Sequence, residues 1–85
     1  MSNLNELFEK AQKDVKSLTD KPGNDILLAL YSYYKQGTQG DVQGDKPGFF
    51  DFVGASKYEA WEALKGTSKE GAMQKYIDQV ARLID

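Results

Sequence analysis

Cysteine and histidine are both absent from the 85 residues of the chain. Without cysteine there is no disulfide and no thiolate nucleophile, and without histidine the commonest general base and zinc ligand are missing. No glycine-rich loop ends in Lys-Ser or Lys-Thr to bind phosphate, and no serine stands in a nucleophile-elbow sequence. These absences exclude most familiar active sites, so we expect a protein that is not an enzyme and has neither a cofactor nor a metal site.

Long apolar stretches are missing as well, since no segment approaches the roughly 18 apolar residues of a transmembrane helix. The first residues show no basic region followed by an apolar run, so we expect no secretory signal. The formal net charge of −2 gives the molecule as a whole no attraction for nucleic acid. We therefore expect a cytoplasmic protein that binds no nucleic acid and does not insert stably into a membrane.

What is present is typical of a small globular domain, with 40% hydrophobic and 28% charged residues. Apolar residues recur every three or four positions in the segment 4–18 and form a continuous helical stripe again in 72–84, and the segment 24–37 between them is more densely apolar. A fourth apolar segment, 49–64, follows a glycine-rich loop and ends near Gly66. The pattern predicts an all-α protein of four helices, and residues 1–85 are expected to form a single domain.

Three residues have the properties of helix N-caps. Asn3 stands three residues before Glu6, Asn24 precedes the second apolar segment, and Thr67 with Glu70 forms a capping box. The first helix is expected to end before Lys21-Pro22-Gly23, because proline and glycine both interrupt helical hydrogen bonding. The second is expected to end at about Gln36 or Gly37.

The segment 24–37 has too many apolar residues for one helix face. At 100° per residue, one side carries Ile26, Ala29, Leu30, Tyr33 and Gly37. The opposite side carries Leu27, Leu28, Tyr31, Tyr34 and Lys35. Either this helix is packed on both sides, or its second side is the wall of a ligand site. On that side Tyr31 and Lys35 are four residues apart, so a phenol and an ammonium group can both donate to one phosphate.

Several longer strings resemble the acyl-coenzyme A-binding protein family. They are YSYYKQGTQGD at 31–41, KPG at 46–48, KYEAW at 57–61 and LKGTSKEGAM at 64–73, together with Phe8, Ala11, Val15-Lys16 and Lys21-Pro22 at the family's spacing. The resemblance covers essentially the whole chain. It implies a four-helix bundle of up-down-down-up topology that binds long-chain fatty acyl-CoA esters noncovalently, without catalysis. The ligand would be carried inside the cell by a protein expected to be monomeric.

The resemblance also implies which residues bind the ligand. Tyr31, Lys35 and Lys57 match the family residues that hold the 3′-phosphate and the adenine end, and Tyr34 matches an aromatic residue that stacks on the adenine. The remaining implied contacts come from Lys16 and Tyr76 to the nucleotide and from Leu28 to the pantetheine and acyl path.

Three positions depart from the family pattern. Tyr58 stands where tryptophan is usual, Val53 where lysine is frequent, and Gln12 where the family has a small alanine beside the nucleotide. The first change is conservative. The loss of a lysine at position 53 would weaken the attraction for phosphate, whereas the longer Gln12 would either crowd the nucleotide or form a new hydrogen bond with it.

Two other functions are compatible with a small helical protein. A helical adaptor that binds a partner helix would explain the apolar excess on segment 24–37, but it gives Lys35 and Lys57 no role. A carrier protein with covalent phosphopantetheine needs an Asp-Ser-Leu sequence at a helix start. The one Ser-Leu pair here, Ser17-Leu18, follows Lys16 near the end of a predicted helix.

Overall fold

The computed structural model describes residues 3–48 and 50–84, which form four helices and contain no strand. The helices are α1 (Leu4–Lys16), α2 (Asn24–Gln39), α3 (Phe52–Glu62) and α4 (Lys69–Ile84). The prediction of an all-α protein is therefore confirmed. None of these helices has the length and apolarity that crossing a bilayer requires.

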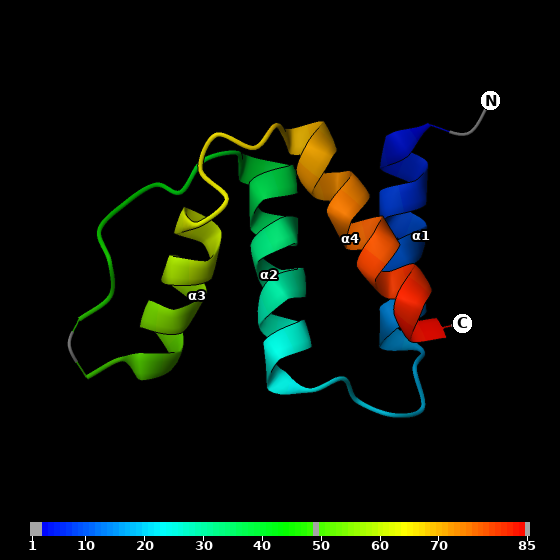
Figure 1. Ribbon diagram of the computed structural model, residues 1–85, viewed down its shortest axis with the longest axis horizontal. Coiled ribbons are helices and arrows are strands. Elements are labelled where there is room, and N and C mark those ends of the chain that lie inside the picture. Colours follow the sequence, from blue (N-terminus) through cyan, green and yellow to red (C-terminus); the bar gives the residue numbers. More distant parts are fainter. Residues whose placement is uncertain (1–2, 49, 85) are drawn as a thin grey trace.

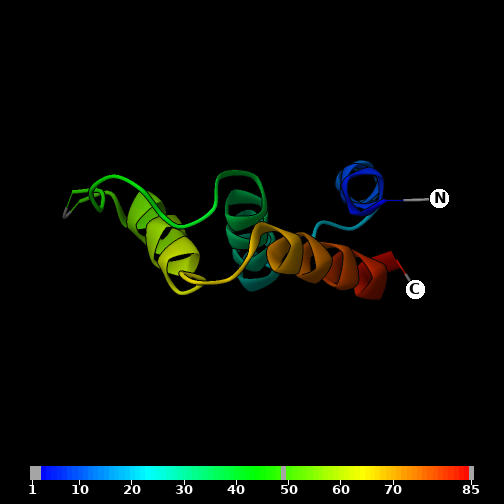
Figure 2. The ribbon, with the colours of Figure 1, turned by 90° about the horizontal axis from the view of Figure 1, so that it is seen from above.

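The helices run in two directions. In Figure 1, α1 and α4 run downward, whereas α2 and α3 run upward, so the topology is the expected up-down-down-up bundle. Within the described residues, α3 contacts α2, α2 contacts α4, and α4 contacts α1. This order makes a thin molecule with extents of 43 × 29 × 14 Å, and Figure 2 shows α3 and α1 at its two ends. A thin row leaves helix faces uncovered.

The core lies where α1, α2 and α4 meet. Its buried residues are Phe8, Ala11, Leu30, Tyr76 and Val80, and Ile26 and Tyr33 of α2 pack against them. The Phe8 ring meets the Tyr76 ring edge to face, with 5.1 Å between the centroids. The core side of α2 is therefore the side that the sequence predicted.

Close approach of α2 and α4 depends on Gly37. A Cβ atom at this position would lie 3.2 Å from Met73 Cγ and 3.6 Å from Phe8 Cζ, so a larger residue would push the helices apart. The α2 helix continues through Gly37 to Gln39, two residues beyond its predicted end, because a glycine needed for packing does not terminate a helix. It stops at Gly40, whose φ of 81° favours glycine.

Of the three N-cap residues predicted from the sequence, the structure confirms one. Asn3 Oδ1 accepts a hydrogen bond from the Glu6 backbone N–H at 2.9 Å, as predicted. Asn24 is the first residue of α2 and not its cap, since Gly23 occupies the cap position without a side-chain hydrogen bond. The capping bond of α4 comes from Ser68, whose Oγ accepts from the Gly71 N–H at 2.9 Å, and not from Thr67.

Two other helix ends differ from the prediction. The α1 helix ends at Lys16, two residues early, where the Ser17 hydroxyl donates to the Asp14 carbonyl at 2.8 Å. The α3 helix ends at Glu62, and the chain then turns through Leu64 to Gly66, whose φ is 93°. In both places the apolar spacing continues into a turn, so periodicity alone overestimates the helix.

A buried glutamine connects the two loops at the end of α2. Gln36 is fully buried, and its Nε2 donates to Asp41 Oδ1 at 2.9 Å and to the Thr67 carbonyl at 2.7 Å. The same Asp41 oxygen accepts from the Gly66 N–H at 2.9 Å. The loops on either side of α3 are thereby attached to α2 and to each other.

Acid should weaken this attachment, because the hydrogen bonds from Gly66 and Gln36 lower the pKa of Asp41. A carboxylate whose pKa is lowered on folding stabilises the fold above its unfolded pKa of about 3.9 and loses that contribution as pH falls through its folded pKa. We expect the free energy of unfolding, measured in urea between about pH 6 and pH 2, to fall less in Asp41→Asn than in the wild type. Solvent screening keeps the difference modest, since Asp41 is exposed.

The matched control for this prediction is Asp45→Asn, which removes the same charge from the same loop. This variant should follow the wild-type pH profile. Equal slopes for wild type and Asp41→Asn would show that the Asp41 bonds do not contribute to stability.

Candidate functional site

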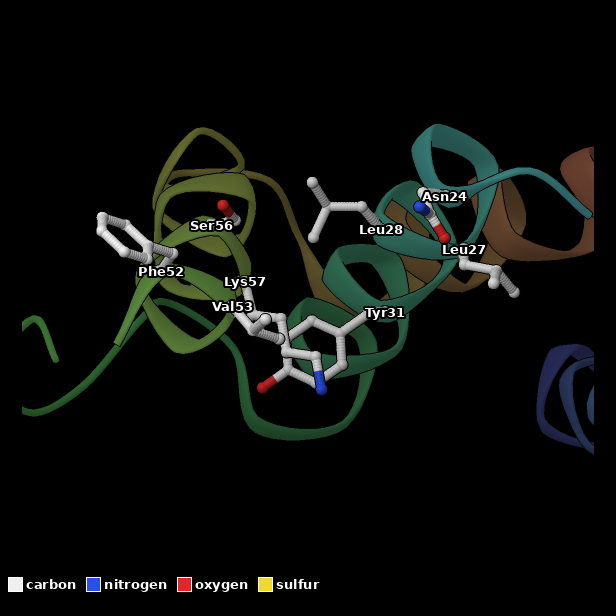
Figure 3. Close-up of a pocket in the computed structure, with 8 residues that line it drawn as sticks. All are labelled: Asn24, Leu27, Leu28, Tyr31, Phe52, Val53, Ser56 and Lys57. Atoms are coloured by element: carbon white, nitrogen blue, oxygen red, sulfur yellow. The ribbon is translucent and has the colours of Figure 1, made fainter. Parts of the chain in front are cut away.

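The larger of two adjoining grooves lies between α2 and α3 and has a volume of about 610 Å³. We call it the α2–α3 groove. Its lining residues are Asn24, Leu27, Leu28, Tyr31, Phe52, Val53, Ser56 and Lys57. Figure 3 shows Leu28 pointing from α2 toward α3. Because most of the lining is apolar, this groove suits a hydrocarbon chain.

One place in the α2–α3 groove carries a positive charge. The Lys57 ammonium lies 5.1 Å from the centroid of the Tyr31 ring, and Figure 3 shows the two side chains crossing beside Val53. A cation over an aromatic face is held by the ring electrons, but it keeps donors free for an anion. The structure thus brings together two residues that were predicted to bind phosphate.

The second groove lies between α1, α2 and α4 and has a volume of about 330 Å³. We call it the central groove. Its lining residues are Gln12, Val15, Lys16, Leu27, Leu30, Tyr31, Tyr34 and Tyr76. Aromatic rings form much of this wall, and the Tyr34 ring lies 6.0 Å from the Phe8 ring. Flat aromatic faces beside a lysine suit a nucleotide base that carries phosphate.

The Tyr76 hydroxyl is a donor at neutral pH. Burial, with a smaller contribution from neighbouring Tyr34, raises the pKa of Tyr76 above its ordinary value. The phenol therefore stays protonated and can donate a hydrogen bond into the central groove.

The two grooves meet at α2. Leu27 and Tyr31, which are four residues apart, line both of them. An elongated ligand with an aromatic, charged head and an apolar tail can therefore contact both grooves by passing over one helix. Six of the seven predicted site residues lie along this path, and they are Lys16, Leu28, Tyr31, Tyr34, Lys57 and Tyr76.

Lys35 is the exception, because it lines neither groove. Its ammonium lies 5.0 Å from the centroid of the Trp61 ring on α3. Two contacts thus join α2 and α3, in which Lys35 meets Trp61 and Lys57 meets Tyr31. Both lysines still lie at the boundary of these two helices.

The lysines of this region are not neutralised by carboxylates. The ion pairs found in the described part of the chain are Lys10 with Asp14 and Lys46 with Glu59, and neither includes a predicted site residue. Neither groove is lined by Asp or Glu among the residues that the structure describes. A local excess of positive charge therefore exists on a chain whose net charge is negative, and it favours an anion.

Several lining residues were not among the predicted site residues. Phe52 and Val53 form the α3 wall of the α2–α3 groove, and Val53 stands four residues before Lys57 on the same face. Leu27 lies on the predicted ligand side of its helix, four residues before Tyr31. The four-residue spacing of Leu27 to Tyr31 and of Val53 to Lys57 is the sequence signal that identifies these lining residues.

The departures at positions 53 and 12 both fall on the grooves. Val53 lines the α2–α3 groove with 68% of its surface exposed, so it extends the apolar wall where a lysine would have added charge. Gln12 lines the central groove, and its Nε2 donates to the Phe8 carbonyl at 3.3 Å.

The chain is similar in sequence and in fold to known proteins. The model of the family described as acyl-CoA-binding protein matches residues 5–80. The acyl-CoA-binding protein of Dictyostelium discoideum is 53% identical over 82% of this chain and 83% of its own length. The crystal structure of Oryza sativa acyl-CoA-binding protein 2 superposes with a TM-score of 0.91 at 41% identity, covering 96% of this chain and 91% of that chain.

A longer relative matches through part of its length. Enoyl-CoA delta isomerase 2 of Rattus norvegicus is 49% identical over 89% of this chain, but the chain spans only 19% of that protein. The similarity to the isomerase is thus limited to a segment of the size of this chain. From the family match, the relatives of similar length and the shared fold, we conclude that the chain belongs to the acyl-CoA-binding protein family.

Proposed function

We propose that the protein binds long-chain fatty acyl-CoA noncovalently and carries it in the cytoplasm as a monomer. Residues 1–85 would act as a single acyl-CoA-binding domain. The observation that carries this proposal is the meeting of an apolar groove and an aromatic, basic groove at Leu27 and Tyr31. An acyl-CoA has the same two parts, an alkyl tail and a charged nucleotide head.

The tail would lie in the α2–α3 groove against Leu28, Phe52 and Val53. Burial of one methylene contributes about 0.8 kcal/mol, so a tail of about a dozen carbons contributes on the order of 10 kcal/mol before the cost of ordering the ligand. The tail therefore supplies most of the affinity, and a short acyl chain would bind weakly.

The head would lie in the central groove. Tyr34 and Tyr76 would contact the base, while Lys16, together with Tyr31 and Lys57 at the boundary of the grooves, would donate to phosphate oxygens. Charge-assisted hydrogen bonds are about twice as strong as neutral ones. Because a free fatty acid leaves these donors unpaired, the head contacts select CoA esters over fatty acids.

Lys35 would join the phosphate contacts when the ligand is present. Its long side chain has four rotatable bonds and could turn from the Trp61 ring toward a phosphate beside Lys57, since a cation–π contact of a half-buried lysine contributes about 1–2 kcal/mol. A dianionic phosphate offers a stronger partner than the ring.

The protein would act as a carrier and not as an enzyme. The groove residues include no carboxylate, and the chain has no cysteine or histidine to attack or hydrolyse the thioester. The ligand would leave chemically unchanged. Protection of the thioester and solubilisation of the tail would be the result of binding.

Calorimetric titration with palmitoyl-CoA, palmitate and free CoA tests the function. We expect one site per chain for palmitoyl-CoA, with affinity at least a hundred-fold above that for either fragment, because only the intact ester fills both grooves (about 2.7 kcal/mol of discrimination or more). Equal affinity for palmitate and palmitoyl-CoA would contradict the proposed role of the lysines. Absence of binding by all three compounds would favour the helical adaptor.

A further inference from the structure

The connection between α2 and α3 leaves the end of α2 and reaches the outer side of α3, as Figures 1 and 2 both show. We call its residues 40–48 the strap. The strap contains neither helix nor strand. Long connections without secondary structure are uncommon in compact domains, and many of them have a function.

Two hydrogen bonds attach the strap to the second half of α3. The indole N–H of Trp61 donates to the Gly40 carbonyl at 2.8 Å, and the Tyr58 hydroxyl donates to the Gly44 carbonyl at 2.9 Å. The later strap residue is bonded to the earlier helix residue, so the strap runs alongside α3 in the opposite direction. Neither Tyr58 nor Trp61 lines the α2–α3 groove, so both bonds are made by side chains outside it.

An ion pair between Lys46 and Glu59 is the third attachment. The hydrogen bond with Glu59 raises the pKa of Lys46, so the ammonium is fully charged at neutral pH. Both side chains are exposed, and exposed ion pairs contribute little individually. The pair therefore adds to the two hydrogen bonds without replacing them.

The strap is also attached to α2 at its start. Asp41 accepts hydrogen bonds from Gln36 of α2 and from the Gly66 N–H, both at 2.9 Å. These attachments matter for α3, which contacts α2 alone among the described helices and contributes one buried side chain, Trp61. One side of α3 faces the groove, so this helix is held in place by its contacts with α2 and by the strap.

We propose that the strap restrains the movement of α3 away from α2 and so limits the rate at which a ligand enters and leaves the α2–α3 groove. The inference rests on the proposed function, because it requires the acyl tail to lie between these two helices. A tail held between two helices leaves when the helices separate, and the strap opposes their separation from the outer side of α3. The Tyr58 bond is a contribution of this chain, since tryptophan, the usual family residue at this position, has no hydroxyl.

Removal of the strap contacts should change rates more than affinity. The contacts are made by residues outside both grooves, so they stabilise the closed arrangement with and without the ligand. A restraint that acts equally on the free and the bound protein slows entry and exit alike, and it leaves the dissociation constant nearly unchanged. Loss of a residue that shapes the ligand site would instead raise the dissociation constant.

Stopped-flow displacement of bound palmitoyl-CoA by an excess of a fluorescent acyl-CoA tests the proposal. We expect dissociation to be about five-fold faster in Tyr58→Phe and about two-fold faster in Lys46→Met, as the loss of one hydrogen bond and of one exposed ion pair implies. The combined variant should release the ligand about ten-fold faster, while its dissociation constant stays within about two-fold of the wild-type value.

Two controls and a second measurement separate the restraint from other effects. Lys10→Met, which removes the ion pair with Asp14 on α1, should release the ligand at the wild-type rate. The exchanged pair Lys46→Glu, Glu59→Lys should also release it near that rate, because the attraction is restored. Amide hydrogen exchange of the ligand-free protein should be faster in α3 of the combined variant and unchanged in the three core helices.

The possible results distinguish this inference from the proposed function. If the combined variant keeps the wild-type dissociation rate, or if its dissociation constant rises in proportion to that rate, the strap does not act as a restraint and the inference is wrong, although acyl-CoA binding stands. Faster release with unchanged exchange in α3 would contradict the inference as well. If the wild type binds no palmitoyl-CoA, the proposed function fails and this inference about ligand exchange fails with it.

Discussion

Replacement of Phe8 by alanine is expected to lower the free energy of unfolding by about 3 to 5 kcal/mol. Phe8 is 4% exposed, its ring contacts the rings of Tyr34 and Tyr76, and it lies near Gly37 where α2 and α4 are closest. Alanine would leave a cavity at the point where three helices meet. A domain of 85 residues has a total stability of about 4 to 13 kcal/mol, so the variant would lose much of it.

Urea unfolding, followed by far-ultraviolet circular dichroism of the helices, measures this loss. Phe8→Leu should cost much less, because it retains most of the apolar volume. Leu7→Ala removes a side chain of similar size from the neighbouring position, where it is 41% exposed, and should have a small effect. If Phe8→Ala and Leu7→Ala proved equally mild, the assignment of the core to this face of α1 would be wrong.

The largest loss of affinity is expected from the double variant Lys35→Ala, Lys57→Ala. Each ammonium that donates to a phosphate contributes about 1.5 to 3 kcal/mol, so the loss of both should weaken the binding of palmitoyl-CoA by about a hundred-fold or more. Each single variant should weaken it by about ten-fold or more. Calorimetry gives the dissociation constants, and thermal melts show whether the fold is intact.

The matched control is the double variant Lys10→Ala, Lys65→Ala, which removes the same charge from places outside both grooves. It should bind almost as the wild type does, because charges distant from the ligand are screened by salt. Palmitate, which has no phosphate, should bind the Lys35→Ala, Lys57→Ala protein as weakly as it binds the wild type. An unchanged affinity for palmitoyl-CoA in that protein would favour the helical adaptor instead.

The two sides of α2 could be predicted from sequence because a helix repeats with fixed geometry. Leu30 is buried with Ile26 and Tyr33 packed nearby, whereas Leu28 and Tyr31 line a groove, as a rotation of 100° per residue requires. Helix geometry does not predict the contacts that a side chain makes with a residue of another helix. The position of α3 decides that Lys35 meets Trp61 while Lys57 meets Tyr31, and no local pattern contains that position.

The start of α4 is a second feature that could not be predicted from the sequence. Thr67 and Ser68 are both good N-cap residues, and local propensity does not choose between them. In the structure, the Thr67 carbonyl accepts a hydrogen bond from Gln36 of α2, and the next residue, Ser68, makes the capping bond of α4. The contact with Gln36 joins residues that are 31 positions apart. The choice between Thr67 and Ser68 as the cap therefore cannot be predicted from neighbouring residues alone.

The place of α3 at one end of the row affects how a ligand enters and leaves. Within the described residues, α3 contacts α2 among the helices and contributes one buried side chain, Trp61, whereas the core is built from α1, α2 and α4. Because α3 adds one buried side chain, we expect its opening to cost less free energy than the opening of the three core helices. A ligand bound between α2 and α3 stabilises the ordered form of α3 by mass action, so occupancy of the site and order in this helix are thermodynamically linked. If the tail lies in the α2–α3 groove as proposed, the helix that holds it is also the one that can release it without unfolding the core.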